Sequence, residues 1–376
     1  MNKEGAVQKA VADVVDLHQN RFALLKAAEN PKIGWVTIYT PEEILLAAGV
    51  IPFRLTGEVG MNITESSAVL GNNYCSYVLS CLGEGLSGVY DFADGVIFAD
   101  ACDMRKRLWE AWGRDVQANT SYFLEFPNDA SDISKEYFAS QLRNLIKTLE
   151  RQYDCEISDE ALRKSIAVCN TSRTLMQRLS QYSKGGQKVL SGHDAIQIVK
   201  AASTGLKESF NTKMSTLLDA LEASEEPAVS KQHRVMICGS YFDHSEIIEI
   251  IEGSGADFVC GDISNGVKYF EGNIDLNADP VTAIADYYLE KNTSSYRLDT
   301  DVRVEHLLNL VEEYKVDSVI YYALKFCDTN LHDFPYVKEK LKDEKVPVLF
   351  VEGERNTTNF AGMKTRIQTF LEARMF

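Results

Sequence analysis

Short apolar runs alternate with amphipathic segments along most of this chain. Residues 1–19 have the spacing of an amphipathic helix, and the next third of the chain contains four runs typical of strands. Strands that alternate with helices form mostly parallel sheets with helices on both faces. The first part of the chain therefore predicts an α/β unit with strands at residues 33–40, 50–55, 95–100 and 120–127.

Strand signals stop in the middle of the chain and then return. Residues 134–152 and 158–223 show long helical patterns, and the polar stretch 224–232 has the composition of a linker. The pattern predicts two doubly wound, Rossmann-like α/β domains with mostly parallel sheets, joined by a helical connector. Its parts are an N-terminal helix with the first domain (1–157), the connector (158–228) and the second domain (229–376), whose predicted strands are 233–240, 256–262, 316–324 and 346–354.

Local signals refine two helix starts. Thr40 followed by Pro41, with Glu43 three residues after Thr40, predicts a capping box at the first helix of the sheet. A further helix is expected near residues 335–344. His244 precedes another predicted helix, and a capping role is expected for it.

Charge and length narrow the class of protein. The 376 residues carry a net charge of -16, which argues against nucleic-acid binding because phosphate contacts need a basic surface. No apolar run reaches the roughly 18 residues of a membrane helix, and the N-terminus lacks the apolar centre of a signal peptide. A cytoplasmic protein without membrane contact is therefore expected, in which the eight cysteines are buried thiols or ligands rather than disulfides.

Several common chemistries lack their motifs. No paired CxxC motifs or Cys/His finger indicate structural zinc, and no P-loop is present. The glycines of GEGLSG (83–88) have the GxGxxG spacing, but they lie in a predicted helix and turn with no strand immediately before them, so they do not indicate a dinucleotide site. Ser240 is not part of the Gly-x-Ser-x-Gly pattern of a nucleophile elbow.

Three cysteines stand out from the other five. Cys102 directly follows a predicted strand, Cys327 lies shortly after another, and Cys75 opens a predicted helix. Open α/β folds gather such positions at the carboxyl ends of their strands. Three thiolates can hold an iron–sulfur cluster and leave its fourth iron without a cysteine.

Packing is the alternative for every cysteine, because free cysteine is among the most buried residue types. Cys81 is the rival of Cys75, and packing is expected for the remaining four, Cys155, Cys169, Cys238 and Cys260. Aromatic side chains near the candidates could either line a dry site or belong to the ordinary core: Tyr74, Tyr77, Trp109, Trp112, Phe326 and Phe334.

Taken together, several segments resemble the 2-hydroxyacyl-CoA dehydratase family, which includes benzoyl-CoA reductase subunits. The resemblance covers nearly the whole chain beyond the first helix. The segments that carry it are TPEEILLAAGVIPFRL, NYCSYVLSCLGEGLSG, GVIFADACDMRKRLWE, VMICGSYFDHSEIIEIIEGSGADFVCGD, SVIYYALKFCDTNLHDFPYVKEKL and VPVLFVEGERNTTNFAGMKTRIQTFLE.

The resemblance implies a β subunit with a [4Fe–4S] cluster on Cys75, Cys102 and Cys327, most similar to the 2-hydroxyisocaproyl-CoA dehydratases. It further implies a homologous α subunit as partner, which binds most of the acyl-CoA substrate, and an ATP-dependent iron–sulfur activator protein. One electron on the thioester carbonyl would give a ketyl radical that expels the 2-hydroxyl group, and this chain would relay that electron.

Two other functions stay open. The chain could be a benzoyl-CoA reductase-type subunit, which reduces a ring instead of eliminating water. It could also be a non-catalytic scaffold subunit without a cluster, in which all eight cysteines serve packing.

Overall fold

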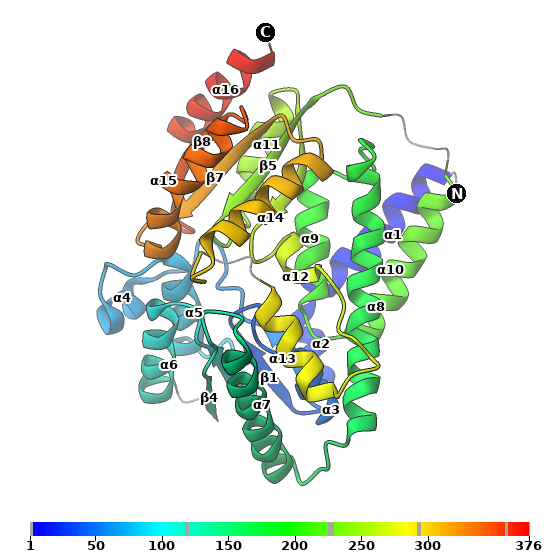
Figure 1. The fold of residues 1–376 in the computed structure, drawn as a ribbon, viewed down its shortest axis with the longest axis vertical. Coiled ribbons are helices and arrows are strands. Elements are labelled where there is room, and N and C mark those ends of the chain that lie inside the picture. The colour runs from blue at the N-terminus through cyan, green and yellow to red at the C-terminus, as the bar shows by residue number, and fades with distance from the viewer. Residues whose placement is uncertain (1–2, 117–119, 225–228, 292–294, 358–359, 376) are drawn as a thin grey trace.

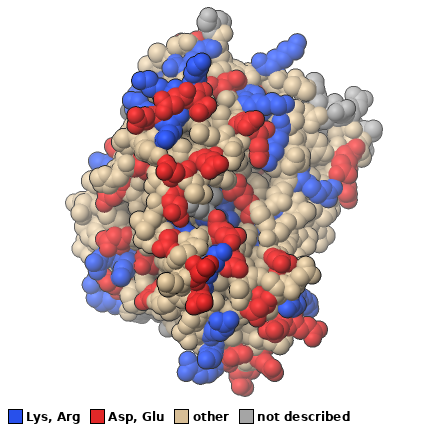
Figure 2. Space-filling view, in the orientation of Figure 1, with Lys and Arg blue, Asp and Glu red and all other residues tan. Residues whose placement is uncertain are grey.

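The computed structural model describes residues 3–116, 120–224, 229–291, 295–357 and 360–375. None of the helices within these ranges combines the length and the apolar character that crossing a membrane requires. Figure 2 shows acidic and basic side chains interspersed over one face of the molecule.

Two four-stranded, fully parallel sheets organise the chain (Figure 1). The first has the order β2-β1-β3-β4 and the second has the order β6-β5-β7-β8, so both sheets repeat one topology. The expected pair of doubly wound α/β units is confirmed. The strands are β1 (Lys32–Trp35), β2 (Ile51–Arg54), β3 (Gly95–Ala99), β4 (Ser121–Leu124), β5 (His233–Gly239), β6 (Ala256–Asp262), β7 (Ser318–Leu324) and β8 (Val348–Gly353).

Burial explains why the inner strands read as continuous apolar runs. Every residue of β3 and of β7 is buried, because helices cover both faces of a parallel sheet. The outer strands β4 and β8 are only partly buried.

Helices cover the sheets and fill the region between them. Figure 1 shows the second sheet in the upper half, the first in the lower half, and α1, α8 and α10 along one side. The helices are α1 (Lys3–Gln19), α2 (Arg21–Ala27), α3 (Glu42–Ala47), α4 (Thr64–Leu70), α5 (Ser76–Leu86), α6 (Asp103–Asp115), α7 (Asp132–Tyr153), α8 (Asp159–Lys184), α9 (Gly192–Ala202), α10 (Lys207–Glu222), α11 (Ser245–Gly253), α12 (Val267–Phe270), α13 (Pro280–Glu290), α14 (Thr300–Glu313), α15 (Asp328–Asp343) and α16 (Ala361–Met375).

The three predicted parts of the chain are interwoven. Helices α8, α9 and α10 occupy the stretch expected to be the connector, while residues 225–228 of the expected linker lie outside the described residues. Helix α13 follows β6 in sequence but packs against α7 and α8, and its Ile284 and Leu289 share a core with the first sheet. The domain boundaries themselves stay a prediction.

Three local expectations are wrong. Strand β1 ends at Trp35 rather than at Thr40, because the chain turns away from the sheet there and its next residues face a cavity. Pro41, not Thr40, is the N-cap of α3, and Glu43 makes an ion pair instead of a capping box. Helix α15 begins at Asp328 and runs through Pro335.

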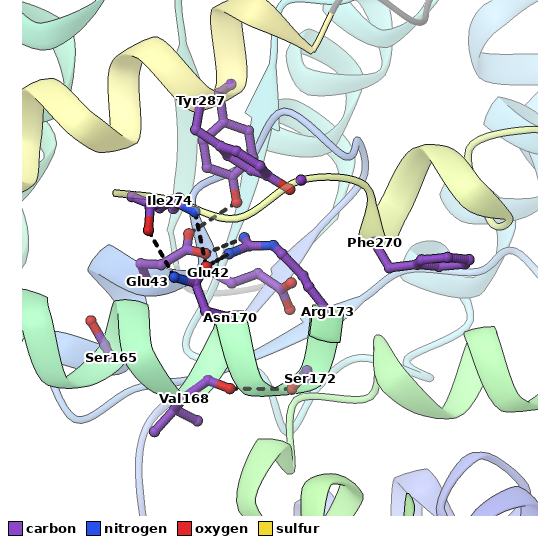
Figure 3. Close-up of polar contacts among 12 residues, drawn as sticks. Glu42, Glu43, Ser165, Val168, Asn170, Ser172, Arg173, Phe270, Ile274 and Tyr287 are labelled. Atoms are coloured by element: carbon purple, nitrogen blue, oxygen red, sulfur yellow. Dashed lines mark hydrogen bonds and ion pairs between the residues drawn. The ribbon is translucent and has the colours of Figure 1, made fainter. Parts of the chain in front are cut away.

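A buried layer of charged groups joins the first sheet to the helical region (Figure 3). Glu43 of α3 forms an ion pair with Arg173 of α8 and accepts a hydrogen bond from Tyr288 at 3.0 Å. The Arg173 guanidinium also donates to Asn170 at 2.9 Å. Asn170 in turn binds the backbone of Ile274 through both its amide nitrogen and its oxygen.

The neighbouring Glu42 forms a second pair in this layer. Its carboxylate accepts hydrogen bonds from Lys207 of α10 at 3.0 Å and from the Tyr269 hydroxyl at 2.8 Å. One short helix, α3, is thereby bound to α8, α10, α12 and α13, so these buried pairs hold together segments that are distant in sequence.

Replacing Arg173 by Met should lower the free energy of unfolding by about 3–5 kcal/mol, because the Glu43 carboxylate would stay buried without its cation. Burial raises the pKa of Glu43, but the Arg173 guanidinium and hydrogen bonds outweigh burial and hold that pKa below its ordinary 4.5. A lowered carboxyl pKa gives stability that is lost as the pH falls. The difference in unfolding free energy between wild type and Arg173→Met should therefore be smaller at about pH 4 than at about pH 7, as measured by urea unfolding.

The matched control is Arg178→Met on the same helix. Arg178 pairs with Glu222 at 2.6 Å, but both side chains are about half exposed, so the loss should be at most about 1 kcal/mol. Equal losses for the two variants would show that the buried pair is not the stronger connection.

Candidate functional site

A cavity lies where the carboxyl ends of the two sheets face each other. In a sheet of this strand order, the crevice between the first and third strands is the usual ligand site. The cavity takes its walls from the chain just after β1, β3, β5 and β7, and it encloses ≈ 700 Å³ including its open mouth. Its lining consists of Thr37, Ile38, Tyr39, Cys75, Tyr77, Val78, Ala101, Cys102, Arg105, Gly239, Ser240, Tyr241, Ser264, Lys268, Ser295, Leu324, Cys327, Thr329 and Asn330.

Three cysteines from distant positions line this cavity together: Cys75, Cys102 and Cys327. Each occupies the N-cap position of a helix, namely α5, α6 and α15. A helix N-terminus carries a partial positive charge and unpaired N–H groups, which stabilise a thiolate over a thiol. The site therefore directs three helix N-termini at three sulfur atoms.

The repeated topology explains how two of the sulfurs meet. Cys102 follows β3 and Cys327 follows β7, and these strands hold equivalent places in the two sheets. Phe326, directly before Cys327, adopts a left-handed conformation with φ of 62°, which is uncommon for a bulky residue. This turn directs Cys327 out of the strand and into the start of α15.

Burial and mutual repulsion oppose ionisation of the thiols. Burial and then the nearby Cys327 and Cys102 raise the pKa of Cys75 to about 12. Burial also raises the pKa of Cys102, while Arg105 acts in the opposite direction. A positively charged group bound between the sulfurs would compensate the negative charge of three adjacent thiolates. Metal binding to thiols releases their protons in this way.

Polar contacts reach the sulfurs and the helix that carries Cys75. The Asn330 amide donates a hydrogen bond to the Cys327 sulfur at 3.1 Å. Tyr77, two residues after Cys75, donates to the Val36 carbonyl at 3.0 Å and to the Leu55 carbonyl at 2.9 Å. These contacts hold the start of α5 against the first sheet.

The donor set of the cavity limits the kind of metal group that its residues could hold. Among the described residues, no group of three or more His, Cys, Asp or Glu side chains is close enough to hold one metal ion. A [4Fe–4S] cluster binds each thiolate through a different iron, so its ligands surround a larger body. Three free cysteines line one cavity, Cys75 buried and Cys102 and Cys327 partly exposed, and they fit this donor set.

Comparison with known proteins adds a family. Residues 37–373 match the family model described as 2-hydroxyglutaryl-CoA dehydratase, D-component. The chain belongs to this family. The family resemblance expected from the sequence is confirmed, and so is the expectation that the chain is a component of a hydro-lyase of this type.

Individual relatives of the dehydratase family span nearly the full chain. The (R)-phenyllactyl-CoA dehydratase beta subunit of Clostridium sporogenes is 25% identical, and the match covers 90% of this chain and 91% of the relative. Lactoyl-CoA dehydratase subunit beta of Anaerotignum propionicum is 25% identical with the same coverage. A benzoyl-CoA reductase subunit of Thauera aromatica is 26% identical over 91% of this chain and 90% of the relative. Particular closeness to 2-hydroxyisocaproyl-CoA dehydratases stays a prediction.

Other cysteines of this dehydratase-family chain lie elsewhere. Cys81 is fully buried beside Gly57, and it is absent from the described lining of the cavity. Cys238 and Cys260 are buried in a hydrophobic core, as expected for packing. Cys169 is buried near the charged groups Glu43 and Arg173, and Cys155 is partly exposed.

Of the two possibilities for the aromatic candidates, the ordinary core holds for most of them. Of the six aromatic candidates, Tyr77 alone is among the described lining residues. Trp112 packs on Phe98 and Phe334 packs on Phe350, because both side chains point into cores beneath the sheets.

Sequence reasoning missed the polar side of the cavity, with Arg105, Lys268 and Asn330. Arg105 and Asn330 each stand three residues after a candidate cysteine at a helix start. That spacing was the available signal for these two, because residues three apart lie on one face of a helix.

Replacing Gly239 by Ala should destabilise the protein by about 1–3 kcal/mol or more. Gly239 has φ of +116°, and an added Cβ would lie 2.2 Å from the Tyr322 carbonyl oxygen on β7. Urea unfolding of Gly362→Ala is the control, since a Cβ at that helical position meets no atom within 4 Å. Equal stability of the two variants would contradict the close approach of β5 and β7 at the cavity wall.

Proposed function

We propose that this chain is the β subunit of an oxygen-sensitive (R)-2-hydroxyacyl-CoA dehydratase, and that it holds a [4Fe–4S] cluster on Cys75, Cys102 and Cys327. One observation carries the proposal: three cysteines, each at a helix N-terminus, line one cavity between two sheets. The cluster would supply a one-electron centre. The chain would act in the cytoplasm with a homologous α subunit that binds most of the acyl-CoA and an ATP-dependent iron–sulfur activator.

The residues of this chain would hold and shield that centre. Cys102 follows a strand of the first sheet and Cys327 follows a strand of the second. A bound cluster would therefore join the two α/β units and add to the stability of the fold. Tyr77 and Tyr241 stack with ring centroids 4.6 Å apart at the wall of the cavity, and both are buried. This stacked pair excludes water from one side of the site.

Dehydration of a 2-hydroxyacyl thioester explains why an electron is needed. The β-proton of the substrate is weakly acidic, so acid–base elimination is slow. An electron on the thioester carbonyl expels the hydroxyl group and makes that proton easier to remove. In this scheme the present chain delivers and recovers the electron, while its partner holds the substrate.

Anaerobic purification tests the proposal directly. Wild-type protein should contain about four iron and four sulfide per chain, and Cys102→Ala should lose most of both. Cys75→Ala should behave in the same way, whereas Cys81→Ala should keep its iron if Cys75 is the ligand. Iron and sulfide analysis with visible absorption provides the measurement.

Cys155→Ala is the matched control, because Cys155 is outside the cavity. An iron-free wild-type protein would favour the scaffold function. Full cluster content in Cys102→Ala would remove this residue from the ligand set.

A benzoyl-CoA reductase-type subunit is the second candidate, favoured by the match to the benzoyl-CoA reductase protein of Thauera aromatica. The two functions differ in the reaction of the assembled complex. Co-expression with a homologous partner and activator, followed by assays with (R)-2-hydroxyacyl-CoA and with benzoyl-CoA, separates water elimination from ring reduction.

A further inference from the structure

One cation of the cysteine cavity has no carboxylate partner among the described residues. Arg105 lies on the first turn of α6, three residues after Cys102, and its guanidinium is 5.9 Å from the centre of the Tyr77 ring. Its side chain lines the cavity together with the three cysteines. The titratable groups that interact with its charge are Cys102, Tyr77, Cys75 and Cys327.

Other cations near the site are neutralised. Lys268, which lines the opposite side of the cavity, lies 3.2 Å from the Asp262 carboxylate. Arg107, two residues after Arg105 on α6, pairs with Glu110 at 2.8 Å on the exposed face. For Arg105, no ion pair to a carboxylate is found within the part of the chain that the structure describes.

An unbalanced guanidinium beside three helix N-termini adds positive charge to the cavity. Charge in a partly buried site interacts more strongly than in water, so this cation would offset the negative charge of a cluster with its thiolate ligands. An iron–sulfur cluster with thiolate ligands gains one further negative charge when it is reduced. A fixed cation close to it therefore stabilises the reduced form more than the oxidised form.

We propose that Arg105 is the counter-charge of the cluster and raises its reduction potential. This inference rests on the proposed function and deepens it, because it assigns the control of electron affinity to one side chain of this chain. Arg105 would act through the field at the sulfurs and irons, as a positioning and tuning group, and would contribute no ligand.

The test is a redox titration of purified wild type, Arg105→Gln, Arg105→Lys and Arg107→Gln, followed by electron paramagnetic resonance. Dithionite or titanium(III) citrate supplies the electrons. At a fixed potential, Arg105→Gln should lower the ratio of reduced to oxidised cluster at least tenfold, a shift of about 59 mV for one electron. Arg105→Lys should stay within about threefold of wild type, because it keeps the charge, and so should Arg107→Gln.

The outcomes distinguish a failure of this inference from a failure of the proposed function. An unchanged or higher potential in a fully loaded Arg105→Gln variant overturns the role of Arg105 and leaves the cluster intact. Arg105→Gln could also lose its iron. In that case, an Arg105→Lys variant that keeps its iron and the wild-type potential supports the role of the charge. Loss of iron in both variants overturns that role. Wild-type protein without iron overturns the proposed function itself.

Discussion

The buried guanidinium of Arg355, held by the Asp243 carboxylate, links the second sheet to the first α/β unit. Arg355 follows β8, and its guanidinium binds Asp243 at 2.6 and 2.9 Å and also donates to the Thr56 and Gly57 carbonyls of the first half. Its backbone N–H donates to the Ser76 hydroxyl at 3.0 Å, directly beside Cys75. A planar guanidinium can satisfy all these acceptors at once, which a lysine could not do.

The cavity exists because the contacts of Arg355 hold the carboxyl ends of the two sheets close together. Arg54 adds a second link, since it leaves β2 of the first sheet and donates to Ser264, just beyond β6 of the second. Breaking one partner of such buried pairs leaves an uncompensated charge, so the two halves are strongly coupled. The relative placement of Cys102 and Cys327 follows from this coupling, because each cysteine belongs to a different sheet.

The sequence predicted the parts of the site that depend on local pattern. Cys102 follows an apolar strand and precedes a predicted helix, and Cys75 opens one, so their N-cap positions could be expected. The N-cap position of Cys327 could not, because the predicted helix lay near residues 335–344. The pairs Glu43–Arg173 and Asp243–Arg355 could not, because they join residues more than a hundred positions apart and leave no periodic signal. Helix α15 begins at Asp328, before the predicted residue 335, and it continues through Pro335, although proline is usually unfavourable inside a helix.

The chemistry of the cavity wall bears on the open corner of the proposed cluster. Apart from the three cysteines, the described lining residues include no thiol, imidazole or carboxylate. Two of the hydroxyl groups are already engaged: Ser240 accepts a hydrogen bond from the Leu324 N–H at 3.1 Å, and Ser264 accepts one from Arg54 at 3.0 Å. The fourth iron of the proposed cluster would therefore meet no thiol, imidazole or carboxylate of this chain among the described lining residues.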